Sequence, residues 1–208
     1  MTVITISREL GSRGTVIAEN VAQALGVDCI DKEVLAEMAR QSGLSVEVIV
    51  EAEERLLSQP RVISQEMRHL FAADQRNRSG AMDQVSYVRQ MTEAIRFLAG
   101  QGNVVLVGRG SQVILHEHPG ALHVHLYASP EVRARRIQRR RELAELETAS
   151  QIIQQADNAR QEWFRRFFTG VDWKNPSYYN LLIDTGRIAE EIAVDTIVRI
   201  AQMPSIPE

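Results

Sequence analysis

The sequence predicts an α/β protein in which a mostly parallel, five-stranded sheet lies between layers of helices. Short, near-continuous apolar runs recur along the chain, and helical stretches separate them. Such runs are typical of parallel strands buried on both faces. Their alternation with helices implies βαβ units and a doubly wound sheet. The expected strands are residues 3–7, 27–30, 103–108, 122–128 and 179–185.

Helical patterns follow several of these runs. We expect helices over residues 16–25, 32–41 and 188–201, and another that opens at Pro130. Ser129 is the expected N-cap of that helix, because a serine hydroxyl can accept a bond from a free backbone N–H and proline suits the first turn.

Residues 44–100 interrupt this rhythm, since they contain several helical patterns and no convincing strand. We expect a helical insertion between the second and third strands, with a mobile turn in the polar stretch 74–84. At 208 residues the chain suits one well-buried core carrying such an insertion. The expected organisation is a single domain over residues 1–203 and a frayed tail over 204–208.

Composition narrows the class of function. The net charge of −3 predicts no general attraction to nucleic acid. Only two of the 24 cationic residues are lysines, so arginine, which suits bidentate phosphate contacts, carries nearly all the positive charge. No apolar run approaches the roughly 18 residues of a membrane span, and no leader pattern precedes residue 3. We therefore expect a cytoplasmic protein without a membrane partner.

The segment VITISRELGSRGT, residues 3–15, has the outline of a phosphate-binding loop between a strand and a helix. When the pattern GxxxxGK[ST] is laid over residues 8–15, Thr15 keeps its place, but Arg8 and Arg13 stand at the two glycines. Gly14 stands at the lysine that would neutralise phosphates. On this segment alone, a glycine turn that binds no ligand is an equally good interpretation.

Residues that follow the apolar runs suggest a chemistry, because open α/β sheets bind ligands at the carboxyl ends of their strands. Arginine, aspartate and hydroxyl side chains dominate there, which is typical of sites for phosphate and Mg²⁺. Four histidines lie close in sequence but straddle a turn or alternate along a strand, so we do not expect a metal cluster from them. The residues collected in this way are 7–15, Asp31, 108–111, Ser129 and 184–185.

Taken together, the motifs resemble the cytidylate kinase-like family, a divergent branch of the nucleoside monophosphate kinases. In chain order they are ITISRELGSRG, DKE, VLVGRGSQVIL, YASPEVRARRIQRR, the D-x-x-R of Asp157 and Arg160, and YYNLLIDT. The resemblance extends over about residues 2–200. It implies the P-loop kinase fold, with an acceptor-binding helical insert at 44–100 and an arginine-rich lid at 139–172.

The resemblance also implies roles for individual residues. The loop would hold the donor phosphates, with Thr15 near the metal. Without the loop lysine, Arg8, Arg13 or an arginine of the lid would have to supply the charge. Backbone contacts would come from Gly11, Ser12 and Gly14. Relatives commonly read GSGGR here, so Arg13 is a departure.

The remaining implied roles concern the acceptor and the transferred group. Asp31 would orient the acceptor or metal, and Arg109 would hold the acceptor phosphate, although the aspartate expected beside it is Gly110. Asp157 would bind substrate in the lid region. Catalytic charge stabilisation is assigned to Arg139, Arg140 and Arg160.

The leading hypothesis is a phosphotransferase that uses ATP and Mg²⁺ and phosphorylates CMP or a related small acceptor. One alternative is a catalytically weak or inactive regulatory protein of the same fold that binds a nucleotide or another anion. A second is a kinase for a different acceptor. The aromatic helix around Trp163 and Phe168 also makes a homodimer plausible.

Overall fold

The computed structural model describes residues 2–58 and 82–203. The chain divides into two compact units. The first contains residues 1–31 and 95–208, and the second contains residues 32–94. The first unit carries the sheet and every residue of the site described below.

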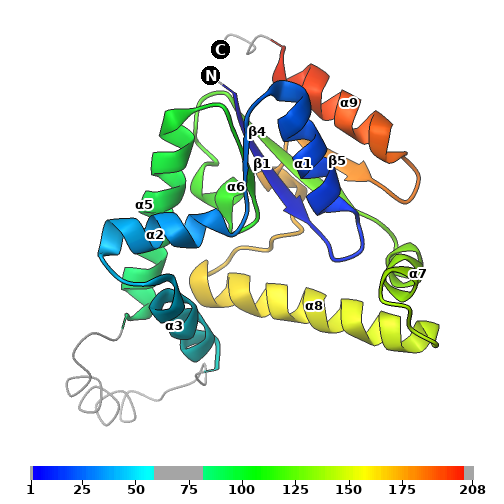
Figure 1. Ribbon diagram of the computed structural model, residues 1–208, viewed down its shortest axis with the longest axis horizontal. Helices are drawn as coiled ribbons and strands as arrows, with labels where there is room; N and C mark the ends of the chain where they lie inside the picture. The colour runs from blue at the N-terminus through cyan, green and yellow to red at the C-terminus, as the bar shows by residue number, and fades with distance from the viewer. Residues whose placement is uncertain (1, 59–81, 204–208) are drawn as a thin grey trace. The chain divides into compact units, whose positions relative to one another are not determined.

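The described residues contain one five-stranded sheet in the order β2-β3-β1-β4-β5, and each neighbouring pair is parallel (Figure 1). β1 lies at the centre, so the loop after it opens at the middle of the carboxyl edge. The prediction of a mostly parallel five-stranded α/β sheet is confirmed. The strands are β1 (Val3–Arg8), β2 (Asp28–Ile30), β3 (Val104–Val107), β4 (Ala121–Tyr127) and β5 (Leu181–Asp184).

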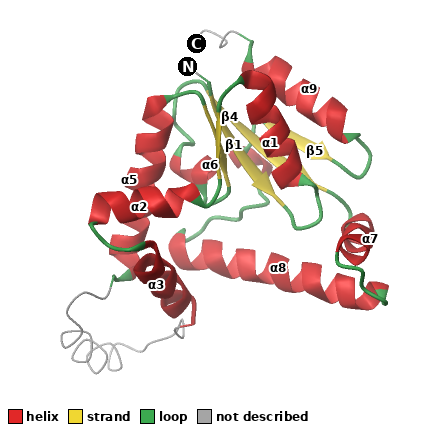
Figure 2. Ribbon diagram, viewed as in Figure 1, coloured by secondary structure: helices red, strands yellow, loops and turns green. Residues whose placement is uncertain are grey.

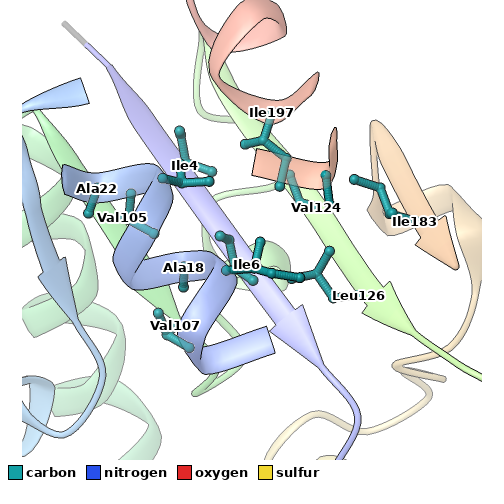
Figure 3. Packing of buried hydrophobic residues seen from close by; sticks show 13 residues of the cluster. Ile4, Ile6, Ala18, Ala22, Val105, Val107, Val124, Leu126, Ile183 and Ile197 are labelled. Carbon is teal, nitrogen blue, oxygen red and sulfur yellow. The ribbon is translucent and has the colours of Figure 1, made fainter. Parts of the chain in front are cut away.

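One face of the sheet carries an aliphatic core. Ile4 and Ile6 of β1 are fully buried and share this core with residues of β3, β4 and β5. Helices α1 (Gly14–Leu25) and α9 (Glu190–Ala201) cover the face, and Figure 3 shows Ala18, Ala22 and Ile197 turned toward the strands. Burial of this apolar area stabilises the unit by about 25 cal/mol per Å² removed from water.

The opposite face is polar at its centre. Because successive strand residues point to opposite sides, Thr5 and Ser7 of β1 lie on the side away from the aliphatic core, and both are buried. The Thr5 hydroxyl lies 2.8 Å from Nδ1 of His123 on β4. His125, two residues on, contacts the rings of Trp173 and Tyr179. The central strands therefore separate an aliphatic layer from a polar aromatic one.

Further helices of the first unit follow the strands. α6 (Ser111–Ile114) comes after β3, and α7 (Pro130–Arg140) comes after β4. α8 (Leu146–Phe167) and the 3₁₀ turn η1 (Pro176–Tyr178) precede β5. The Ser129 hydroxyl accepts a hydrogen bond from the Val132 N–H at 3.4 Å, as predicted for the N-cap.

Two predicted features of this unit need comment. The last helix was expected from residue 188 but begins at Glu190, because the Ile188 N–H is held in a turn by the Asp184 carbonyl. The aromatic residues of α8 contact one another, and Phe164 and Phe167 are buried within this chain. The homodimer stays a prediction.

The described residues of the second unit form helices joined by loops (Figure 2). It holds α2 (Glu33–Ser42), α3 (Val46–Ser58) and the first part of α5 (Gln84–Gln101), which continues into the first unit. Most of the predicted polar turn at 74–84, and the tail 204–208, lie outside the described residues. Within the described ranges, no helix has the length and apolar character to cross a bilayer.

Candidate functional site

The loop between β1 and α1 is a tight turn built on left-handed backbone. Gly11 has a φ of 86°, and a Cβ added to it would lie 2.9 Å from the Arg133 carbonyl oxygen, so no larger residue fits there. Arg13 is also left-handed, with a φ of 62°, and caps α1 through its backbone conformation. Ser12 is fully buried, and its hydroxyl bonds the Glu9 carbonyl at 2.8 Å. Ser12 therefore shapes the loop from inside.

A pocket of about 630 Å³ opens over this loop. The end of β1, the loop, the first residues of α1, the C-terminal half of α7, and single residues of α8 and α9 enclose it. The lining residues are Arg8, Glu9, Leu10, Gly11, Arg13, Gly14, Thr15, Val16, Arg136, Ile137, Arg139, Arg140, Arg160 and Glu190.

The pocket is built to attract anions. Six arginines face it and only two carboxylates do. Gly14 and Thr15, the first residues of α1, also line it, and a helix N-terminus carries a partial positive charge. Of the predicted residues, the structure brings together Arg8, Gly11, Arg13, Gly14, Thr15, Arg139, Arg140 and Arg160. Ser12, Asp31, Arg109 and Asp157 are absent from its lining.

Arg160 has the most unusual surroundings of these arginines. Its Nη1 is buried and has no hydrogen-bond partner among the described residues. Its guanidinium lies 5.1 Å from the centre of the Trp173 ring. Burial, and then the charge of Arg8, lower the pKa of Arg160 to about 10, so it remains cationic at neutral pH. A buried N–H without a partner is costly, and an anion in the pocket would satisfy it.

Arg133 of α7 contacts the loop through the Leu10 carbonyl, and no individual role was predicted for it from the sequence. It is 3% exposed. Its two Nη atoms donate to both oxygens of Asp157, at 3.1 and 2.8 Å, and its Nε lies 3.2 Å from Glu9. Lys174 closes the ring, 2.9 Å from Glu9 and 3.8 Å from Asp157. Asp157, predicted to bind substrate, is thus engaged in a buried charge network.

Arg136 ties α7 to two strand ends. It donates to the Thr185 hydroxyl at 3.1 Å, to the Thr185 carbonyl at 2.6 Å and to the Gly11 carbonyl at 3.2 Å. Burial, and then the charge of Arg13, lower the pKa of Arg136. Arg139 and Arg140 lie about one helical turn after Arg136. Both are exposed and line the pocket.

Asp31 lies at the end of β2 and receives a hydrogen bond of 2.8 Å from Nη2 of Arg8. The structure therefore joins two predicted site residues directly. Arg109 lies outside the lining of the pocket and has a left-handed φ of 53° between Gly108 and Gly110.

Gly110 explains why this chain lacks the aspartate expected there. Its φ is 68°, and a Cβ added to it would lie 2.6 Å from Cε2 of Phe168. An aspartate at this position would require the phenyl ring to move.

A second pocket, of about 310 Å³, adjoins the first and shares Arg13, Arg136 and Glu190 with it. It continues along the loop from Thr185 to Ala189. Glu190 stands at the junction, where it accepts from Arg13 and Asn20 at 3.2 Å each.

Four histidines lie within the residues that the structure describes. No cluster of three or more histidine, cysteine, aspartate or glutamate residues suited to a metal occurs within 2–58 and 82–203. His123 and His125 are both 4% exposed. Burial lowers the pKa of each to about 4, and both are neutral at physiological pH. They are part of the polar layer behind the central strands.

Five residues of the site had no individual role predicted for them, although Glu9 belongs to the collected segment 7–15 and two of the arginines belong to the motif YASPEVRARRIQRR. They are Glu9, Arg133, Arg136, Lys174 and Glu190. A weak signal existed for two of them. Ala134 and Ile137 mark the buried face of α7, and Arg133 and Arg136 flank that face at helical spacing. Glu9 and Lys174 carry no such pattern, because their partners lie far away in the sequence.

A parallel sheet in this strand order, with a glycine-containing loop after its central strand and six arginines around the pocket over that loop, is typical of a kinase-like phosphotransferase of the P-loop fold. The sequence agrees with this class over nearly its whole length. The chain belongs to the cytidylate kinase-like family, whose family model matches residues 3–187.

Individual relatives are distant. A protein named cytidylate kinase from Archaeoglobus fulgidus is 27% identical over 207 residues, which cover 98% of this chain and 96% of the relative. One of the same name from Pyrobaculum arsenaticum is 26% identical over 195 residues, with coverages of 93% and 89%.

Solved structures show the same fold at lower identity. An uncharacterized protein from Eubacterium ventriosum has a TM-score of 0.67 and 19% identity, with coverages of 98% of this chain and 100% of that chain. A shikimate kinase from Bacteroides thetaiotaomicron has a TM-score of 0.50 and 14% identity, with coverages of 97% and 99%.

Proposed function

We propose that this chain transfers the γ-phosphoryl group of ATP to CMP or a closely related small phosphorylated acceptor. One observation carries the proposal: the loop, the start of α1 and six arginines all line one pocket. Phosphoryl transfer requires mainly the positioning of two substrates and the neutralisation of charge. CMP is the first candidate because two relatives that match most of this chain are named cytidylate kinases.

The positions of the arginines suggest a different role for each group of them. Arg160 offers an N–H that lacks a partner among the described residues, and Arg139 and Arg140 project from the end of α7. We assign these three to the charge that develops on the transferred group. Arg109, beside the end of β3, is assigned to the acceptor phosphate by its position in the family pattern.

In this proposal, the second pocket holds the nucleoside of the donor. This pocket shares three side chains with the phosphate pocket and extends away from the loop. A nucleotide whose phosphates lie over Gly11 and Thr15 would therefore place its sugar and base between Arg136 and the loop ending at Ala189.

Mg²⁺ fits the residues that are present. Mg²⁺ commonly takes one or two protein ligands, with substrate phosphates and water completing its octahedron. Thr15 lines the pocket at the start of α1, where its hydroxyl would be such a ligand. When bound, the ion supplies charge neutralisation between phosphate oxygens.

A second candidate is a regulatory protein that binds a nucleotide without turning it over. The absence of lysine at Gly14 favours it, as do the ion pairs of Arg8 with Asp31 and of Arg13 with Glu190. In each of these ion pairs, a carboxylate already binds an arginine that catalysis would need for the phosphates.

A coupled assay of ADP release separates the candidates. Purified protein with ATP and Mg²⁺ is offered CMP, dCMP, UMP and AMP in turn, and turnover is expected to be fastest with CMP. Tight ATP binding by calorimetry without turnover of any acceptor would favour the regulatory protein. Preferential turnover of another acceptor would keep the reaction and change the substrate, and a thermal-shift screen of phosphorylated metabolites would then identify it.

The Arg160→Gln variant tests the site itself. Loss of one preorganised donor to developing charge is expected to lower kcat by about 10²- to 10³-fold. The matched control is Arg165→Gln on the same helix, because Arg165 is 54% exposed and pairs with Glu162. Equal activities of the two variants would remove Arg160 from the proposed machinery.

A further inference from the structure

Two glycines from different elements border the side chain of Arg8. A Cβ added to Gly14, the first residue of α1, would overlap the Arg8 Cβ and lie 2.8 Å from its Cγ. A Cβ added to Gly108, after β3, would overlap Nη1 and lie 3.4 Å from Cζ. Position 108 therefore cannot accept a side chain while the Arg8 guanidinium keeps its place, and position 14 cannot accept one while residue 8 has a Cβ.

Arg8 is held at its tip as well as along its stem. Asp31 accepts from Nη2 at 2.8 Å, while the side chain is 22% exposed and lines the phosphate pocket. A guanidinium has five N–H donors in a rigid plane, so one partner leaves further donor positions on the group. Asp31 fixes the plane of Arg8 and thus acts as a positioning residue for it.

The electrostatics of the pocket agree with this placement. Arg160 also lines it, and the charge of Arg8 is the second cause, after burial, of the lowered pKa of Arg160. Two cations near each other at one pocket repel, and an anion between them relieves that repulsion. Phosphate oxygens between Arg8 and Arg160 would also satisfy the buried Nη1 of Arg160.

Arg13 is less suited to the same task. Its side chain is 56% exposed, and its Nη1 lies 3.2 Å from Glu190, at the junction of the two pockets. An exposed guanidinium in high dielectric contributes less to phosphate binding than a partly buried one. Arg8 therefore has the better position, although Arg13 is closer to the helix start in sequence.

We propose that Arg8 takes over the role of the missing loop lysine, with Gly14 and Gly108 providing the space it needs. The assignment rests on the proposed function and names the residue that neutralises the phosphates of its donor. The cation thus comes from the end of the central strand, while the usual pattern would place it on the first turn of α1. The same cause then explains why position 14 lacks the lysine and why it holds glycine, because a side chain there would displace Arg8.

The proposal predicts an exchange of positions. Arg8→Ala removes the cation, and Gly14→Lys places a second long side chain where Arg8 already lies, so each single variant should bind ATP poorly. The double variant Arg8→Gly with Gly14→Lys also removes the Cβ at position 8, which alanine would keep, and puts a cation back, so it should recover most of the lost affinity. Loss of a charge-assisted hydrogen bond to phosphate should weaken binding about 10- to 100-fold.

The measurement is calorimetric titration of each folded variant with ATP and Mg²⁺ in the absence of acceptor. Arg8→Gln keeps the bulk of the side chain without its charge, and it replaces Arg8→Ala if that variant does not fold. Arg199→Ala is the control for arginine loss, because Arg199 is 73% exposed and pairs with Asp195 on α9. Wild-type affinity in Arg8→Ala and Arg8→Gln would overturn the proposal. So would a double variant Arg8→Gly with Gly14→Lys that binds no better than Arg8→Gly alone.

Turnover with CMP distinguishes this proposal from the proposed function. If the wild type turns over no acceptor but the ATP affinities of the variants change as predicted, Arg8 neutralises the phosphates and the proposed kinase activity is wrong. If the wild type phosphorylates CMP and loss of Arg8 changes neither Kd nor kcat, the activity stands and the assignment of Arg8 fails. A wild type that binds no ATP would overturn both.

Discussion

Single residues with left-handed backbone shape the edge of the sheet next to the site. Gly108, Arg109 and Gly110 follow one another with φ values of 77°, 53° and 68°. For a residue with a Cβ this conformation costs roughly 1–2 kcal/mol, so Arg109 is held there by its surroundings. The two glycines differ in what they admit, because Gly108 borders Arg8 and Gly110 borders the ring of Phe168.

Replacing Gly110 tests the close approach of Phe168. Gly110→Ala should lower the free energy of unfolding by about 2–4 kcal/mol, from backbone strain together with overpacking against the ring. Gly26→Ala is the matched control, because Gly26 has a φ of 67° and nothing within 4 Å of its added Cβ. It should cost only the backbone strain, about 1 kcal/mol. Equal losses in urea unfolding would show that Phe168 does not restrict position 110.

Among the elements, α7 determines how the site is assembled. Arg133 connects it to Glu9 beyond β1 and to Asp157 on α8, and Arg136 connects it to Thr185 beyond β5. The same helix then ends with Arg139 and Arg140 at the pocket. Arg133, which is buried, and Arg136, which is half-buried, connect the helix to other elements, whereas Arg139 and Arg140 are exposed at the pocket.

Removing Arg133 should be far more damaging than removing its neighbour. Arg133→Ala leaves Glu9 and Asp157 without their buried partner, and breaking such a network costs about 3–5 kcal/mol. Arg135→Ala, at an exposed position on the same helix, should change stability by less than about 0.5 kcal/mol. Urea unfolding followed by circular dichroism compares the two, and similar losses would show that the network contributes little.

For the molecule as a whole, the two faces of the sheet respond differently to pH. The buried residues of the aliphatic core are Ile, Val, Leu and Ala, whereas the polar face buries His123 and His125, each with a pKa lowered to about 4. In the unfolded chain both would titrate near 6.5. The unfolded state therefore binds more protons between these values, and stability is lost as pH falls from about 6.5 to about 4.

The size of this effect can be measured. Each buried histidine contributes at most about 3 kcal/mol to the pH dependence of unfolding. The His125→Phe variant keeps a ring in the aromatic layer and removes one titrating group. Its free energy of unfolding should fall less than that of the wild type between pH 7.5 and pH 5. Parallel curves for the two proteins would place the pH sensitivity elsewhere.

Much of the fold could be predicted because it depends on local patterns. The apolar runs at β1, β3 and β4 identify buried parallel strands, and Ser129 with Pro130 marks where α7 starts. The site was only partly predictable. The lining of the pocket includes Arg8, Thr15 and Arg160 as predicted, since they follow a strand or belong to a recognisable motif.

The sequence by itself determined the α/β class, the family and the arginine-rich loop, because hydrophobic periodicity and ordered motifs are properties of neighbouring residues. The tertiary structure decided which charged side chains form ion pairs with one another and which line the pocket. Asp157 joins Arg133 across 24 positions, and Glu9 joins Lys174 from a separate segment. The distance between Gly14 and Arg8 likewise follows from how the loop folds back on β1. Whether two charged side chains pair depends on the distance between them in the folded chain, and that distance cannot be read from their separation in the sequence.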